Sequence, residues 1–260
     1  MTDLPSPPAH LPVEDAAATP EGRTQQLLRL LDVEPVGDDL FFGTRQPGAK
    51  GRVFGGQVIA QGLMASMRTV DPARIAHSLH AYFMRGGDDA LPITYRVERD
   101  FDGGSFSTRR IIAMQEDRPI LSMSASFHKL EEGFTHADAM PDVPAPEALQ
   151  PESERIAALA DPQMVAMLTH FQRVRPIEIR WVNPRMPGDP QPTAPLGYCW
   201  FRLTAPIGDD MNLHRAILAY ASDMTLLDTC ILPHPINWHS PGFQSASLDH
   251  AVWLHGDFRV

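Results

Sequence analysis

The chain has 260 residues, of which 43% are hydrophobic and 21% charged, and its formal net charge is −10. This length is sufficient for one large domain or for two domains of ordinary size, each with its own core. The acidic balance argues against a nucleic-acid groove, because an acidic surface gains no counterion release from phosphates. A polyanionic ligand would need a local basic patch.

The two cysteines, Cys199 and Cys230, belong to no Cys-x-x-Cys pair and to no Cys/His ligand set. The sequence therefore predicts neither a metal site nor a structural disulfide, which fits a reducing compartment. Residues 1–22 lack the cationic start and apolar run of a signal peptide, and no apolar stretch is long enough to span a membrane. We expect a soluble, cytoplasmic protein with a flexible N-terminal tail at residues 1–22.

In the first half, the pattern predicts two helices and a β-rich region. A short apolar periodicity predicts a helix over residues 24–31, and a strand candidate follows at 40–44. Apolar residues recur at three- and four-residue steps over residues 58–69, which predicts a helix directly after Phe54-Gly55-Gly56-Gln57. Strand candidates follow at residues 78–84, 93–101, 105–115 and 120–130, and tight turns join the last three.

The second half repeats this order after a proline-rich stretch at residues 137–152, the best candidate for a linker. A helix is expected over residues 152–171 with a weak point at Pro162, then strands at 177–182 and 198–204, a long apolar helix at 213–232 and a strand at 245–254. Each half runs strand, buried helix, strand, which indicates a duplicated unit. We divide the chain into a first unit at 23–136, a linker with a helix at 137–172 and a second unit at 173–260.

Five blocks of sequence carry a resemblance to a known family. They are Val53-Phe54-Gly55-Gly56-Gln57-Val58, His77-Ser78-Leu79-His80-Ala81-Tyr82-Phe83, Gly103-Gly104-Ser105-Phe106-Ser107-Thr108-Arg109-Arg110, Tyr220-Ala221-Ser222-Asp223 and Ala246-Ser247-Leu248-Asp249-His250. In this order, from about residue 24 to the end, they resemble the acyl-CoA thioesterase II (TesB-like) family. The resemblance implies an α+β tandem double hotdog, in which each antiparallel sheet wraps around a long central helix.

The resemblance also implies a reaction and a site. Such enzymes hydrolyse fatty acyl-CoA to free acid and coenzyme A without a cofactor or metal, and they assemble as homo-oligomers. Their catalytic Asp corresponds to Asp223 and their catalytic Ser or Thr to Ser247. Their catalytic Gln lies in a C-terminal segment that this chain lacks, so the resemblance implies an incomplete second hotdog.

Asp223 also stands out from the residues alone. It falls within the apolar run at 213–232, and burying a lone carboxylate costs several kcal/mol unless it gains hydrogen bonds. Burial would raise its pKa and suit it to act as a general base toward water. The alternative is structural: Asp223 caps a kink or pairs with an arginine. The chain has no Gly-x-Ser-x-Gly motif, which favours direct attack by water over an acyl-enzyme.

Substrate-binding candidates come from two of the blocks. Gly55, Gly56 and Gln57 begin the first long helix, where glycine would allow a ligand to approach closely; tight helix packing is the alternative. Arg109 and Arg110 are candidates for coenzyme A phosphates, together with Arg85, unless they only form surface ion pairs.

Three other polar residues, His80, Asp249 and His250, are interpreted as structural. Two further readings of the function stay open. One is a catalytically impaired fragment or acyl-CoA-binding protein that lacks the C-terminal Gln. The other is a hotdog enzyme of different chemistry, such as a dehydratase or hydratase, although the residues fit that chemistry less well.

Overall fold

The computed structural model describes residues 19–46, 51–185, 191–238 and 240–260. Its helices are α1 (Pro20–Leu31), α2 (Gly55–Met67), η2 (Pro146–Ala148), α3 (Glu152–Ala157), α4 (Pro162–Val174), α5 (Met211–Ser222) and α6 (Asp228–Ile231). Its strands are β1 (Val33–Gly37), β2 (Leu40–Gly43), β3 (Arg74–Phe83), β4 (Ile93–Asp102), β5 (Phe106–Gln115), β6 (Arg118–Lys129), β7 (Ile177–Trp181), β8 (Cys199–Leu203) and β9 (Asp249–Trp253).

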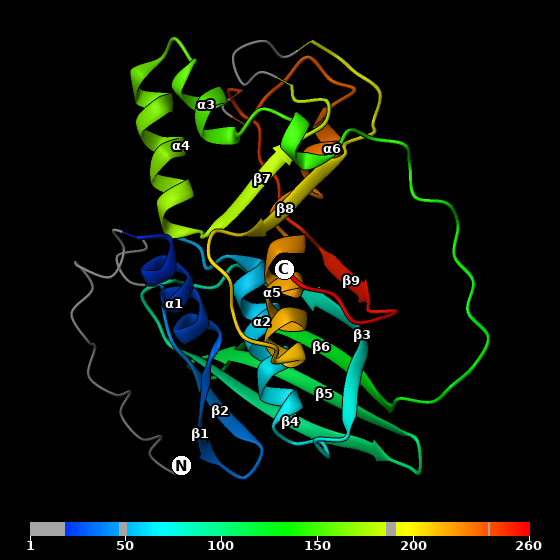
Figure 1. Ribbon diagram of the computed structural model, residues 1–260. Helices are drawn as coiled ribbons and strands as arrows, with labels where there is room; N and C mark the ends of the chain where they lie inside the picture. Colours follow the sequence, from blue (N-terminus) through cyan, green and yellow to red (C-terminus); the bar gives the residue numbers. More distant parts are fainter. Residues whose placement is uncertain (1–18, 47–50, 186–190, 239) are drawn as a thin grey trace.

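A single antiparallel sheet, in the order β1-β2-β4-β5-β6-β3-β9, forms the wall against which α2 packs (Figure 1). Strands β4, β5 and β6 are the predicted meander, and their inward side chains alternate with outward ones, as a half-buried sheet requires. Strand β9, from the second half of the chain, pairs antiparallel with β3, so that the two halves share this sheet. Strands β7 and β8 form a separate two-stranded sheet.

The two long helices α2 and α5 lie side by side against the sheet (Figure 1). Residues of these two helices contribute to two clusters of buried apolar side chains. One lies between α2 and the seven-stranded sheet, and includes Ile59 and Leu63, both fully buried. The other joins α1, α2 and α5 to the β7–β8 pair, and includes Leu31 and Ile217. Helix α5 therefore packs in the same hydrophobic core as the helices and strands of the first half of the chain.

The predicted elements of the first half are confirmed, with shifts at their ends. Helix α1 begins at Pro20, inside the predicted tail, because Thr19 caps it and accepts a hydrogen bond from Gly22 N at 3.1 Å. The rest of the predicted tail, residues 1–18, lies outside the described residues. Strand β1 was not predicted; it contains Pro35, which a sheet accepts at its edge. Helix α2 begins at Gly55, three residues before its predicted start.

In the second half, the helix predicted over residues 152–171 is two helices, α3 and α4, which separate before Pro162 because Asp161 caps the second. The prediction of one long helix over residues 213–232 is wrong, because that segment forms two separate helices. Helix α5 ends at Ser222, Asp223 is its C-terminal cap, and α6 follows as a separate turn. Strand β9 is shorter than the predicted 245–254, although Leu248 O still accepts a hydrogen bond from Phe83 N.

Candidate functional site

A cavity of ≈ 320 Å³ lies where the first turn of α2, the end of α5 and the segment before β9 meet. It brings together three residues that the sequence predicted from separate blocks: Gly55, Asp223 and Ser247. The remaining lining comes mostly from the loops beside α2 and from the end of β3, and includes Arg52, Val53, Val58, Phe83, Met84, Arg85, Gly86, Gly87, Ile120, Leu121, Ser245, Ala246 and Leu248.

Asp223 joins the end of one helix to the start of the other. Its Oδ2 accepts a hydrogen bond from Gly56 N at 2.7 Å. Helix α2 has no side-chain cap of its own, since its N-cap residue is Phe54, so Asp223 satisfies one of the unpaired N–H groups of the first turn. The positive end of the α2 dipole also favours a carboxylate at this position. Asp223 therefore caps the start of α2, which is neither the kink nor the arginine pair of the structural alternative, and its role as a general base stays a prediction.

Two glycines allow this approach. A Cβ on Gly55 would stand 2.8 Å from Asp223 Oδ2, and a Cβ on Gly56 would stand 2.4 Å from Tyr220 O in α5. Real Cβ atoms essentially never show contacts below 3.0 Å, so a larger residue at position 56 would force the two helices apart, and one at position 55 would displace the Asp223 carboxyl. Gly56 is thus required for the packing of α2 on α5, whereas Gly55 leaves room for the carboxyl of Asp223 and the ring of Phe83 and lines the cavity.

The carboxyl of Asp223 is largely removed from water, with its side chain 11% exposed. Burial raises the pKa of Asp223, and the nearby His250, the Gly56 N–H and Arg175 oppose that rise. Burial lowers the pKa of His250, while Asp223 and Asp249 act in the opposite direction. A carboxyl with a raised pKa is a better proton acceptor than an ordinary surface carboxylate.

Sequence reasoning set His250 aside as structural, but its ring lies against Asp223. His250 Nδ1 is 3.6 Å from Asp223 Oδ1, and His250 Nε2 is 2.9 Å from Ser222 Oγ. The alternation of the predicted strand at residues 245–254 could have indicated that His250 faces inward. His250 is the buried position of β9, between Asp249 and a half-buried Ala251, and an inward-facing histidine needs a polar partner.

Ser247 and Gln57 have different surroundings. Ser247 is half-buried and lines the cavity, and within the described part of the chain no hydrogen bond joins it to Asp223. Gln57 is 4% exposed, and its amide donates to Thr44 O at 3.1 Å. Gln57 thus fastens α2 to the chain after β2, and it is not one of the cavity-lining residues.

The structure does not bring the predicted arginine pair to this cavity. Arg109 is 1% exposed, and its guanidinium donates to Thr69 Oγ1 at 2.9 Å and to Asp102 Oδ1 at 2.8 Å. Arg110 points to the opposite face of β5 and pairs with Glu98 at 2.6 Å. The reason is strand alternation, which sends neighbouring residues to opposite faces, here to the interior and to the outer surface.

Two other arginines do border the cavity. Arg85, which the sequence grouped with the pair above, and Arg52, which sequence reasoning missed, are both exposed lining residues. Arg85 Nη1 donates to Pro119 O at 2.6 Å, and neither side chain forms an ion pair within the described residues. They form a local cationic rim on a chain of net charge −10.

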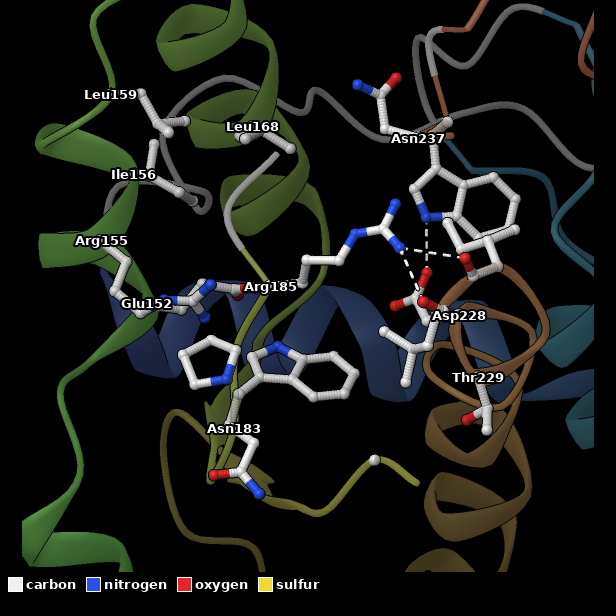
Figure 2. Close-up of a pocket in the computed structure, with 16 residues that line it drawn as sticks. Glu152, Arg155, Ile156, Leu159, Leu168, Asn183, Arg185, Asp228, Thr229 and Asn237 are labelled. Carbon is white, nitrogen blue, oxygen red and sulfur yellow. Dashed lines mark hydrogen bonds between the residues drawn. The ribbon is translucent and has the colours of Figure 1, made fainter. Parts of the chain in front are cut away.

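A second cavity, of ≈ 220 Å³, lies between α3, the end of β7 and α6 (Figure 2). Asp228 accepts a hydrogen bond from Trp238 Nε1 at 2.5 Å, and burial raises the pKa of Asp228. Arg185 donates to the backbone at the end of α6, including Ile231 O at 3.0 Å. None of the predicted site residues lines this cavity.

Within residues 19–46, 51–185, 191–238 and 240–260, no group of three or more His, Cys, Asp or Glu residues could hold a metal ion. Over the same residues, no helix is both long and apolar enough to cross a membrane.

Comparisons with known proteins identify the class of protein to which this fold belongs. Residues 44–128 match the family model described as the acyl-CoA thioesterase N-terminal domain, and residues 170–260 match the model described as acyl-CoA thioesterase. Acyl-coenzyme A thioesterase 8 of Homo sapiens is 37% identical over 246 residues, which are 92% of this chain and 76% of that protein. Acyl-CoA thioesterase 2 of Haemophilus influenzae is 35% identical over 234 residues, 89% of this chain and 81% of that protein.

Solved structures give the same result. The acyl-CoA thioesterase II TesB2 from Mycobacterium marinum matches with a TM-score of 0.68 and 35% identity, over 90% of this chain and 79% of that one. A hot dog fold protein from Alicyclobacillus acidocaldarius matches with a TM-score of 0.66 at 19% identity, over 88% of this chain and 78% of that one, and so supports the fold alone. The chain belongs to the TesB-like acyl-CoA thioesterase family of thioester hydrolases and has the predicted double-hotdog architecture.

Proposed function

We propose that the cavity between α2 and α5 is the site at which this chain hydrolyses acyl-CoA, the general reaction of its family, and that Asp223 is its general base. The observation that carries this proposal is the position of Asp223. Its buried carboxyl, with a raised pKa, lines the cavity beside the first turn of the α2 helix and shares that cavity with Ser247.

The reaction needs no covalent intermediate. A water molecule attacks the thioester carbonyl carbon while Asp223 removes one of its protons, and the carbonyl oxygen becomes an oxyanion. The N–H of Gly55, in the first turn of α2, has no intrahelical acceptor and would stabilise that oxyanion. The C–S bond then breaks, and the thiolate of coenzyme A takes the proton from Asp223. Ser247, which lines the same cavity, would orient the attacking water.

The rim arginines give the proposal a binding element. Arg52 and Arg85 border the cavity and are exposed, so they could meet the phosphates of coenzyme A without breaking buried contacts. For this role they replace the predicted Arg109 and Arg110, whose guanidinium groups are already engaged elsewhere. The paired substitution R52Q/R85Q should raise KM more than it lowers kcat.

The decisive experiment measures thiol release from a series of acyl-CoA substrates by the wild type and by Asp223→Asn. The amide keeps the size of the carboxylate but cannot accept a proton, so we expect a loss of about 10²–10⁴-fold in kcat. Asp228→Asn is the matched control, because it neutralises a buried carboxylate close by in sequence but outside the cavity, and it should keep near-wild-type turnover. Full turnover by Asp223→Asn would remove Asp223 from the mechanism. Substrate binding without turnover by the wild type would instead favour the acyl-CoA-binding protein.

Two further properties concern the location of the protein and its assembly. Both cysteines are free thiols, which suits a reducing, cytoplasmic location, although a yeast relative at 26% identity is named peroxisomal. Fractionation of expressing cells tests this. Strand β9 lies at the edge of the seven-stranded sheet, where an unpaired strand can join another chain, which would suit a homo-oligomer. Light scattering of the purified protein measures the assembly.

A further inference from the structure

The two ring nitrogens of His250 have different neighbours: Nε2 lies beside Ser222 Oγ, and Nδ1 faces Asp223 Oδ1. Ser222 Oγ lies 3.0 Å from Ala219 O, to which its single hydroxyl hydrogen donates. The same Oγ can therefore only accept at its 2.9 Å contact with His250 Nε2. With this donation, a neutral His250 would carry its hydrogen on Nε2 and leave the Nδ1 lone pair free, a tautomer that nitrogen-15 NMR tests directly.

That lone pair faces the Asp223 carboxylate. His250 Nδ1 lies 3.6 Å from Asp223 Oδ1, and the two side chains are 5% and 11% exposed. An N–H···O hydrogen bond is shorter than this separation, at about 2.7–3.2 Å. When neither atom carries a proton, two electron-rich atoms face each other with little water to screen them. A single proton on either atom would convert this unfavourable contact into a charge-assisted or neutral hydrogen bond.

We propose that His250 is a positioning residue for Asp223, and that the two side chains take up as one unit the proton that Asp223 removes from water. The proton leaves the water as its oxygen bonds to the carbonyl carbon, resides between Oδ1 and Nδ1, and passes to the sulfur when the C–S bond breaks. His250 never touches the substrate. Its neutral ring raises the affinity of the unprotonated pair for a first proton, whereas a charged ring lowers the pKa of Asp223 and opposes the uptake of a second. The inference rests on the proposed role of Asp223 as the base.

The other charged groups near the pair bear on its pH dependence. Asp249 neighbours His250 on β9, but it faces outward and lies 3.1 Å from His80. Arg175 acts on the Asp223 side, from above the Phe54 ring at 4.2 Å. Burial raises the pKa of Asp223 and lowers that of His250, which brings the two values toward each other and favours a shared proton. The active form is the pair without the added proton, so activity falls on the acid side of the pair's upper apparent pKa.

The kinetic test compares two substitutions of one residue by their pH profiles of kcat/KM and kcat. His250→Gln places an amide N–H near the Nε2 position, so it retains the contact with Ser222 and loses the acceptor that faces Asp223. We expect its acid limb to move to lower pH and its plateau kcat to fall by about tenfold, because a lone carboxylate is a weaker base. His250→Asn places a fixed donor near Asp223, and its acid limb should move further still. A His250→Gln profile that matches the wild type in both limb and plateau would overturn the proposal.

A second measurement does not depend on turnover. Nitrogen-15 NMR of the histidine ring reports both the tautomer and the titration midpoint of His250. We expect the Nε2–H tautomer at high pH in the wild type, and a growing Nδ1–H population in Ser222→Ala. In Asp223→Asn the midpoint should fall by about 1 pH unit or more, because the carboxylate that favours the charged ring is gone. An unchanged midpoint in Asp223→Asn would also overturn the proposal. Melting curves of each variant verify that it is folded.

The outcomes separate the two proposals. If Asp223→Asn keeps its turnover, the proposed function fails, whatever His250 does. If Asp223→Asn loses turnover while His250→Gln retains the wild-type pH profile, only the inference about His250 fails. If the wild type shows no turnover, the NMR titration alone decides whether the pair shares a proton.

Discussion

The contact between α2 and α5 can be tested by enlarging one glycine. In Gly56→Ala, the new Cβ would stand 2.4 Å from Tyr220 O and 2.6 Å from an atom of the Phe54 ring. The carbonyl belongs to a helix backbone and cannot rotate away as a side chain can. The helices would therefore separate by several tenths of an ångström, which would also lengthen the 2.7 Å bond from Gly56 N to Asp223.

The magnitude follows from three effects. Overpacking costs about 1–3 kcal/mol, and weakening a hydrogen bond to a buried charged group costs about 1.5–3 kcal/mol. The helix preference of alanine over glycine returns about 1 kcal/mol. We therefore expect Gly56→Ala to lower the free energy of unfolding by about 1.5–5 kcal/mol and to reduce turnover in parallel.

The assay is urea denaturation followed by circular dichroism, with Gly62→Ala as the matched control in the same helix. A Cβ on Gly62 would stand 3.1 Å from Met123 Cε, the flexible end of a side chain that can give way. Gly62→Ala should thus lie between neutral and about 1 kcal/mol stabilising. If Gly56→Ala were as stable as Gly62→Ala, the proposed close packing of α2 on α5 would be refuted.

Three further predictions concern the cavity, the arginines of β5 and the carboxyl of Asp228. In Gly55→Ala the new Cβ would stand 2.8 Å from Asp223 Oδ2, so we expect turnover to fall about 10- to 100-fold. The control is Gly104→Ala, whose Cβ would meet no atom within 4 Å and which should keep the wild-type rate. Equal rates of thiol release by the two variants would contradict this reasoning. Arg109→Gln should lower the free energy of unfolding by about 2–4 kcal/mol, because it leaves buried acceptors unpaired. The control is Arg110→Gln on the outer face of β5, which should leave the urea denaturation curve unchanged. Similar curves for the two variants would be evidence against the hydrogen bonds of Arg109 to Thr69 and Asp102 as a source of stability. Burial raises the pKa of Asp228 above its ordinary value of 3.8, so the folded wild type loses stability as the pH rises through that folded value. Asp228→Asn should therefore melt at a higher temperature than the wild type at neutral pH and lose that advantage toward pH 4, and a constant difference across this range would exclude the linkage.

Much of the fold could be predicted because its signals are local. The strands of the meander alternate inward and outward residues between tight turns, and the apolar steps of α2 repeat at the helical period. The end of α5 could not be predicted in this way. Its apolar run continues to residue 232 without proline or glycine, and the helix nevertheless ends at Ser222, where Asp223 turns to the first turn of α2. The partner that ends α5 lies 167 residues away, so no local pattern records it.

The sequence by itself determined the order of the elements and identified Asp223 as a carboxylate in an apolar setting. It could not determine which of two adjacent arginines faces inward, because that choice depends on which face of β5 the core covers. The tertiary structure alone decided which groups surround the carboxylate: Gly56 from α2, and His250 from β9, whose ring in turn contacts Ser222 of α5. The physical reason is that a buried charge is stabilised by neighbours in space, and these neighbours meet only when β9 pairs with β3 and α5 packs on α2.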